Sequence, residues 1–246
     1  MSLINNGNNP LLVINCLRQG MHLMIHPQLK KFLLIPLGIN TIIYTAAFIT
    51  SYQLMNHFIQ QLIPAWLTWL NWLLWPVFFI SFAIIVFFSF SLLANLIAAP
   101  YYSRLAAQTR FLITGKTSDL PEASWRQIIS AEWRRIRYLL FRLLPLSLLF
   151  LIPLVNLIAP ILWSLFAAWG VGLEYLAYPL ENQGQLFPEQ QKFIKRHRIG
   201  VLCFGGLSGI ALSLPVINLL AAPVAVIAAV IYVQQLSAPE EIRINL

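Results

Sequence analysis

The sequence is poor in charged residues, and above all in acidic ones. Charged residues make up 10% of its 246 residues, and only 8 Asp and Glu oppose 16 Lys and Arg. A soluble domain carries about 25% charged residues. Hydrophobic residues make up 59% of the chain. This composition excludes an ordinary soluble domain and predicts an integral membrane protein.

The sequence also lacks the motifs of enzymes and metal sites. It contains no GxSxG, no HExxH, no P-loop and no glycine-rich phosphate fingerprint. The two cysteines, Cys16 and Cys203, have no CxxC or Cys/His spacing, and the four histidines show no convincing ligand spacing. We therefore expect no catalytic residue, metal, cofactor or disulfide, and the chain is not expected to be an enzyme. Both cysteines are expected to be small buried apolar residues.

Charge is missing from three long stretches, residues 32–103, 143–173 and 199–239. The basic residues lie between these stretches, which is typical of cytoplasmic loops under the positive-inside rule. The net charge of +8 is therefore assigned to membrane topology, and no nucleic-acid partner is expected. Both termini are expected in the cytoplasm, including the charged tail "PEEIRINL".

The first stretch has room for two membrane-spanning helices, because one needs about 20 apolar residues. We expect them at 32–54 and 73–99, within a segment 27–112. The connection "QLIPAWLTWLNWLLWP" has four Trp and no Lys or Arg. It is therefore expected to face outward, into the periplasm of a Gram-negative cell.

The second and third stretches are each too short for two full spans and a turn. One straight span through 143–173 would place the basic residues at 192–198 outside. We therefore predict two half-inserted helical hairpins, at 139–180 and 199–236, which enter and leave the membrane on the cytoplasmic side. Two basic amphipathic segments, 10–26 and 122–142, are expected on the inner membrane surface, with the arginines of the second near anionic lipid. The whole chain, 1–246, is expected to be a single membrane domain.

The two predicted hairpins share a motif, "PLVNLIAP" and "PVINLLAAP". Pro and Asn are poor helix formers, so they are expected to end one half-helix and begin the next. Asn156 and Asn218 then have two possible roles: they cap the turn between helices, or they line an ion path at membrane depth. Glu174 also has two possible roles, because it could reach the interface and pair with an arginine, or relay protons.

The stretch "HPQLKKF" suggests an anion site. Pro27 suits the first position of a helix, and the N–H groups of Gln28, Leu29 and Lys30 would then be free at its positive end. Lys30 and Lys31 add charge, and Arg104 and Arg110 should return nearby on the antiparallel second helix. The alternative is that these cations only anchor the chain at lipid head groups.

Five segments together resemble the CysZ sulfate permease family. They are "PQLKKFLLIPLGIN", "NLIAAPYYSRLAAQ", "AEWRRIRYLL", "IPLVNLIAPILWSLFAAW" and "LPVINLLAAPVAV", and the resemblance covers about residues 15–235. Family members often carry "PGLRRF"; here Gln28 replaces the glycine, and Lys30 and Lys31 replace the arginines. Lys is a point charge without the two-pronged guanidinium of Arg.

The resemblance implies an inner-membrane protein that takes up sulfate for cysteine synthesis, by a channel-like or proton-coupled route. It implies sulfate binding at Gln28, Leu29, Lys30 and Lys31 with Arg104 and Arg110. It also implies two long transmembrane helices, two half-inserted hairpins and a homo-oligomer, dimer-based, with a hexamer as one form. The expected partners are sulfate and membrane lipids. The alternative function is a membrane scaffold or assembly protein that transports nothing.

Overall fold

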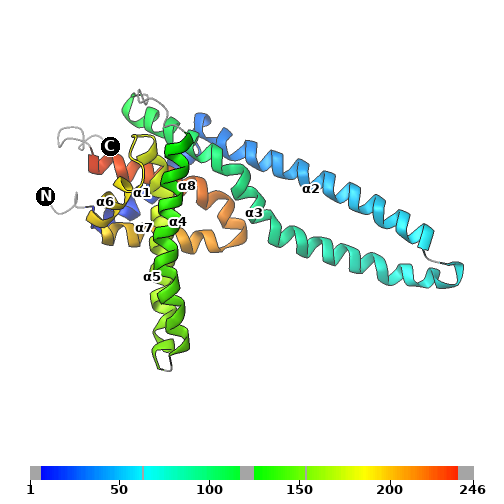
Figure 1. The fold of residues 1–246 in the computed structure, drawn as a ribbon. Helices are drawn as coiled ribbons and strands as arrows, with labels where there is room; N and C mark the ends of the chain where they lie inside the picture. Colours follow the sequence, from blue (N-terminus) through cyan, green and yellow to red (C-terminus); the bar gives the residue numbers. More distant parts are fainter. Residues whose placement is uncertain (1–6, 63, 117–124, 153, 238–246) are drawn as a thin grey trace. The chain divides into compact units, whose positions relative to one another are not determined.

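The computed structural model describes residues 7–62, 64–116, 125–152 and 154–237. Every regular element in these ranges is a helix (Figure 1), so the predicted all-α class is confirmed. The helices form two compact units. The first comprises residues 31–101, and the second comprises the described parts of 1–30 and 102–246.

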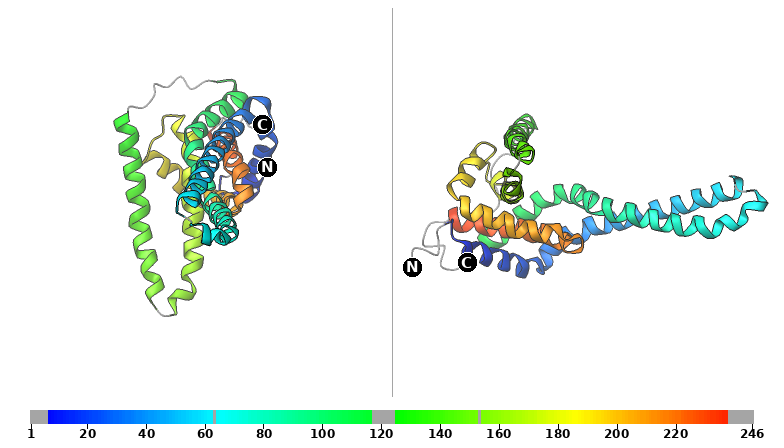
Figure 2. Two further views of the ribbon diagram at one scale, coloured as in Figure 1. Left: turned by 90° about the vertical axis from the view of Figure 1, so that its right-hand side faces the viewer. Right: turned by 90° about the horizontal axis from the view of Figure 1, so that it is seen from below.

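The first unit is an antiparallel pair of long helices, α2 (Pro27–Leu62) and α3 (Asn71–Thr114), joined through the 3₁₀ helix η1 (Ala65–Leu70). Figures 1 and 2 show the two helices side by side. Both are longer than the predicted spans. At about 1.5 Å per residue, the 36 residues of α2 exceed a hydrocarbon core of about 30 Å. The "NLIAAP" repeat at 95–100 lies inside α3 without ending it.

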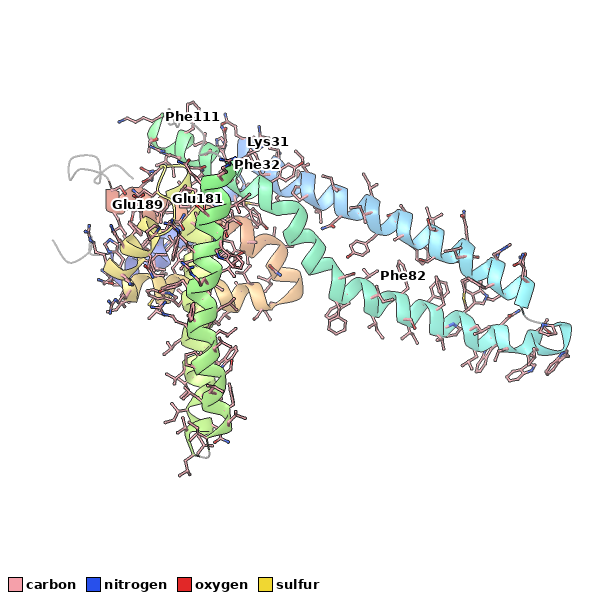
Figure 3. The ribbon with its side chains drawn as sticks, in the orientation of Figure 1. Lys31, Phe32, Phe82, Phe111, Glu181 and Glu189 are labelled. Carbon is pink, nitrogen blue, oxygen red and sulfur yellow. The ribbon has the colours of Figure 1, made fainter. Side chains whose placement is uncertain are left out.

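Aromatic side chains fill the seam between α2 and α3. Phe48 packs edge-to-face on Phe82 with ring centroids 5.2 Å apart, and Tyr52 lies 5.0 Å from Trp75. Figure 3 shows Phe82 between the two helices. Such pairs add stability beyond the area they bury. Almost all of the apolar surface outside this seam is exposed, as expected for helices that face lipid.

The core of the second unit is built from α1 (Pro10–Met24), α5 (Ala159–Glu181), α7 (Arg198–Ser213) and α8 (Pro215–Ser237). α8 is the most buried of the apolar helices, and its Tyr232 packs fully buried beside Phe204 of α7. The predicted amphipathic segment 10–26 forms α1, whose buried face includes Cys16. Burial raises the pKa of the Cys16 thiol to about 12. Cys203 on α7 is only half-buried, so the expectation of burial holds for Cys16 alone.

Two glycines allow α5 and α7 to approach closely. A Cβ atom at Gly205 would collide with the Ala168 carbonyl oxygen, and one at Gly172 would lie 2.8 Å from the Val201 carbonyl oxygen. Helices with small residues at their crossing can bring their backbones together. A Cβ atom at Gly170, by contrast, would meet nothing within 4 Å.

Each predicted hairpin corresponds to a pair of helices. The first is formed by α4 (Trp125–Leu148) and α5, connected through the short 3₁₀ helices η2 (Leu149–Leu151) and η3 (Val155–Leu157). Figure 2 shows α4 and α5 as its two arms. The second is formed by α7 and α8, with the break at Leu214, whose backbone is extended. α6 (Glu189–Arg196) lies between the two hairpins in the sequence.

α4 joins two segments that the sequence suggested separately. It runs without interruption from the predicted amphipathic segment, whose residues 122–124 lie outside the described ranges, into the first arm of the hairpin. A continuous helix has one axis, so both parts share one orientation. Within the part of the chain that the structure describes, four helices are long and apolar enough to cross a membrane: Pro27–Gln61, Trp66–Ser89, Ala159–Glu181 and Ile217–Ser237. Helix length therefore does not fix how deep the hairpins insert, and their half-insertion stays a prediction.

The chain's N-terminal segment is held against α6, α7 and α8. Asn8 accepts a hydrogen bond from the Ile199 N–H (3.0 Å) and donates one to the Arg196 carbonyl (3.3 Å). The buried Tyr232 hydroxyl donates to the Gly7 carbonyl. A Cβ atom at Gly7 would collide with the His197 ring, so glycine is required there. These contacts join parts of the chain that are almost 200 residues apart.

Candidate anion site

The start of α2 lies directly after a tight turn from α1, and His26 occupies that turn. The His26 carbonyl accepts from the N–H groups of Leu29 (2.9 Å) and Lys30 (3.1 Å). The Gln28 N–H donates to Nδ1 of His26 at 3.4 Å. The expectation of three free backbone donors is therefore wrong. His26 serves as the N-terminal cap of α2, because α1 ends only two residues before it.

The side chains at this helix start remain available to a ligand. Gln28 and Lys30 are exposed, whereas Leu29 is fully buried and anchors the turn. The Gln28 side-chain oxygen accepts from Gln108 Nε2 at 3.1 Å. The end of α3 therefore lies beside the start of α2, as the antiparallel arrangement predicted. Lys31 is the first residue of the first unit (31–101). Its ammonium lies 5.2 Å from the Phe32 ring centroid (Figure 3).

Arg110 is anchored at the end of α5. Its Nη1 donates to the carbonyl of Asn182 at 3.2 Å, and Asn182 is the C-terminal cap of α5. This is the negative end of the helix, where a cation is stabilised. Asn182 is held in turn by Ser103, whose carbonyl accepts from its Nδ2 at 3.0 Å. Arg104 is exposed.

One donor of Arg110 is left unused. Its Nε is buried and has no hydrogen-bond partner among the described residues. A guanidinium has five N–H donors and no acceptor, so this group can only be satisfied by an acceptor such as an anion oxygen or a water. Arg110 therefore combines a fixed position with a buried, unfilled donor.

Neither Asn of the hairpin motif begins a helix. Asn156 is exposed in η3, and α5 is capped by Ile158 with no side-chain hydrogen bond. Asn218 lies in the first turn of α8, with its N–H donating to the Leu214 carbonyl at 2.7 Å. The capping role expected for Asn156 is therefore wrong. Pro160 and Pro215 do stand at the helix starts, as Pro commonly does.

Glu174 faces an ion pair on α4. Arg135 Nη1 lies 3.1 Å from Glu132 Oε1, and Glu174 on α5 is near enough to interact electrostatically with both. About two turns further along α5, beyond Tyr178, Glu181 accepts from Gln190 Nε2 at 3.2 Å. Because Arg135 is already paired with Glu132, both roles of Glu174 stay predictions.

The sequence analysis did not single out two residues that the structure brings forward, Asn182 at this site and Asn40 in α2. Asn182 positions Arg110, but nothing in "LENQG" distinguishes it from a surface residue. Asn40 is fully buried in α2, and neither atom of its amide has a partner among the described residues. A lone Asn in a charge-free apolar run was the available signal for Asn40.

Comparison with known proteins matches residues 16–223 to the family described as "Sulfate transporter CysZ/Etoposide-induced protein 2.4". The chain belongs to this CysZ family. The sulfate transporter CysZ of Pseudomonas fluorescens (strain Pf0-1) is 34% identical over 226 residues, covering 88% of this chain and 90% of that protein. The CysZ of Pseudomonas aeruginosa PAO1 is 33% identical, covering 88% and 92%. The CysZ of Pectobacterium atrosepticum is 34% identical over 218 residues, covering 84% and 78%.

The family resemblance inferred from the five sequence segments is thus confirmed. The named relatives are transporters, and the four apolar helices make this chain a membrane protein. No group of three or more His, Cys, Asp or Glu side chains among the described residues could hold a metal ion.

Proposed function

We propose that this protein carries sulfate across the bacterial inner membrane into the cell, where it supplies sulfur for cysteine synthesis. The observation that carries the proposal is the family match over most of the chain, together with relatives named sulfate transporter CysZ. The side-chain donors at the start of α2 and near the end of α3 can supply the hydrogen bonds that sulfate accepts. The protein works as a homo-oligomer based on dimers, and its N- and C-termini lie in the cytoplasm.

The sulfate site is proposed at Gln28, Lys30 and Lys31 with Arg104 and Arg110, and the buried Leu29 only anchors the turn. Because the backbone donors of residues 28–30 are occupied by His26, binding falls to the side chains. Lys and Arg only donate hydrogen bonds, and sulfate near neutral pH only accepts them. Protonated phosphate would bring an O–H group that finds no acceptor there. Sulfate is therefore selected over phosphate by hydrogen-bond pairing and not by size.

The proposed role of Arg110 follows from its anchoring. Its contact with the Asn182 carbonyl fixes the guanidinium, and the exposed part of this half-buried side chain offers its other N–H groups to an anion oxygen. A fixed donor binds with a smaller entropy loss than a mobile one. Lys30, exposed at the start of α2, adds charge that attracts the dianion.

Asn156, Asn218 and Glu174 are proposed along the ion path, which is channel-like or proton-coupled.

The test is sulfate flux into liposomes that contain only the purified protein. Wild-type protein should transport sulfate, and Lys30→Ala with Lys31→Ala should weaken sulfate binding about tenfold or more, as expected for losing charge-assisted hydrogen bonds. Arg126→Ala with Arg134→Ala is the matched control, because it removes two exposed cations of α4. Calorimetry measures binding, and thermal melting checks folding.

Two outcomes would contradict the proposal at different levels. If the wild-type protein gave no sulfate flux, the scaffold alternative would replace transport. If flux were present but both double variants bound sulfate equally, transport would stand and the site at residues 28–31 would be wrong.

A further inference from the structure

A group of exposed cations lies at the junction of α6 and α7. This basic end comprises Lys192, Lys195, Arg196 and Arg198. α6 is fixed to the second unit by its opposite face, where Ile194 is fully buried and Gln190 donates to Glu181 and to the Gln185 carbonyl. The cations therefore project from a rigid helix and not from a loose loop.

The basic end is also ordered internally. Arg198 Nε donates to the Lys195 carbonyl at 3.1 Å, which caps the last turn of α6. Asn8 holds the neighbouring backbone through the Arg196 carbonyl and the Ile199 N–H. His197 breaks the helix here, with φ −116° and ψ 41°, so the two lysines and Arg196 of α6 lie next in the chain to the first turn of α7 but belong to a separate helix.

An apolar stripe begins where the basic end stops. Along α7 the side chains at i, i+4, i+8 and i+11 share one face. They are Ile199, Cys203, Leu207 and Ile210. The three larger ones are between 42% and 68% exposed, and Cys203 is half-buried. At about 1.5 Å per residue the 16 residues of α7 extend about 24 Å.

We propose that the basic end and the apolar stripe together form a binding site for one anionic phospholipid. The phosphate head group is held by the cations, and an acyl chain lies along the stripe. A free anion would need only the cations, and the apolar stripe continuing from them is what points to a lipid. The helix is long enough to pass one leaflet, which is about half of a hydrocarbon core of about 30 Å.

The site has a mechanical consequence for the second hairpin. Lys and Arg near an anionic surface are attracted to it, so a bound lipid fixes the polar end of α7 at the head groups. α7 packs on α5 across the Gly172–Gly205 crossing. The lipid therefore sets the depth of α7, and with it the position of the hairpin in the membrane.

The experiment measures phosphatidylglycerol that stays bound to the full-length protein in detergent, by native mass spectrometry. Lys192→Gln, Lys195→Gln and Arg196→Gln together should lower its affinity about a hundredfold, given the usual contribution of each cation at an anionic surface. Arg198 is left in place because it caps α6. The matched control is the α4 triple Arg126→Gln, Arg134→Gln and Arg137→Gln, which removes the same charge from exposed positions outside the site and should lower the affinity for the lipid far less than the first triple.

A second variant tests the stripe while keeping every charge. Leu207→Gln with Ile210→Gln should also release phosphatidylglycerol, and phosphatidylcholine should bind weakly to all forms. If this variant kept its lipid, or if excess inorganic phosphate displaced the lipid from wild type, the ligand would be a free anion. If the α4 control lost as much bound phosphatidylglycerol, the loss would be due to net charge and not to this site. Dissociation of an oligomer with the lipid retained would assign the stripe to a subunit contact.

Discussion

Asn40 places a fully buried amide within the α2 segment that is apolar enough to cross a membrane. Neither amide atom has a partner among the described residues. One helical turn further, the Tyr44 hydroxyl and Ser89 Oγ lie 2.9 Å apart and satisfy one another. α2 thus carries one polar side chain that is satisfied across the seam and one buried amide that has no partner among the described residues, and an unpaired buried amide costs stability.

Replacing Asn40 by Leu should stabilise the protein. Leu has a similar branched shape and needs no hydrogen bond, so the free energy of unfolding should rise by about 1 kcal/mol, the usual cost of a buried polar group left unpaired. Thermal melting in detergent measures this change. Asn156→Leu, at the exposed hairpin tip, should leave the melting temperature unchanged. A lower melting temperature for Asn40→Leu would show that the amide is paired in the membrane.

His197 should make the protein sensitive to acid. Burial lowers the pKa of its imidazole below the ordinary 6.5, and the nearby Arg196 lowers this pKa further. The unfolded chain then binds the proton more readily than the folded protein, so stability falls as the pH drops through and below about 6.5. The melting temperature should therefore be lower at about pH 5.5 than at about pH 7.5.

The substitution His197→Gln isolates this contribution. The variant should show a smaller difference in melting temperature between the two pH values than the wild type. His22→Gln, which changes an exposed histidine of α1, should behave like the wild type. An unchanged acid response in His197→Gln would assign the effect to other groups.

At the scale of elements, α6 and α7 depend on a residue from the far end of the chain. Asn8 caps the start of α7 through Ile199 and the end of α6 through Arg196. Helix ends leave backbone groups unsatisfied, and a side chain that caps them is usually the nearest residue in sequence. Here the capping residue is distant in the sequence. Asn8, which directly precedes the Asn9 cap of α1, joins the start of α1 to the junction of α6 and α7.

Asn8→Ala should therefore destabilise the second unit. Loss of a capping Asn costs about 1 kcal/mol on average, which should appear as a fall in melting temperature of several degrees. Hydrogen exchange should show faster exchange at the α6–α7 junction. Asn9→Ala is the comparison, because Asn9 caps α1 through the Leu11 N–H. Equal exchange at the α6–α7 junction in both variants would refute the long-range cap.

At the scale of the whole molecule, the proposed topology keeps every basic cluster on the cytoplasmic side. Single cysteines introduced into a Cys16→Ala, Cys203→Ala background can test this. Lys195→Cys, exposed at the end of α6, should react with a membrane-impermeant maleimide only after the cells are opened. Trp69→Cys, in η1 at the connection of α2 and α3, should react in intact cells. Labelling of Lys195→Cys in intact cells would show that the first hairpin crosses the membrane fully.

The sequence by itself determined the all-α membrane class and the family. Hydropathy and charge are properties of neighbouring residues, so the charge-free runs were enough to indicate two long helices and two later helix pairs, but not that α4 continues from the amphipathic segment into its hairpin. Five segments were enough to indicate the family. Prolines at 27, 160 and 215 also lie at helix starts as expected, because their effect on the backbone is local.

The tertiary structure alone decided which donors are free and which are occupied. His26 occupies the N–H groups of residues 28–30, Asn182 holds Arg110, and Asn8 caps a helix that begins almost 200 residues later. Each of these facts depends on which atoms the folded chain brings within about 3 Å of each other. Residue spacing in the sequence does not contain that information, because hydrogen-bond partners are set by the packing of distant helices.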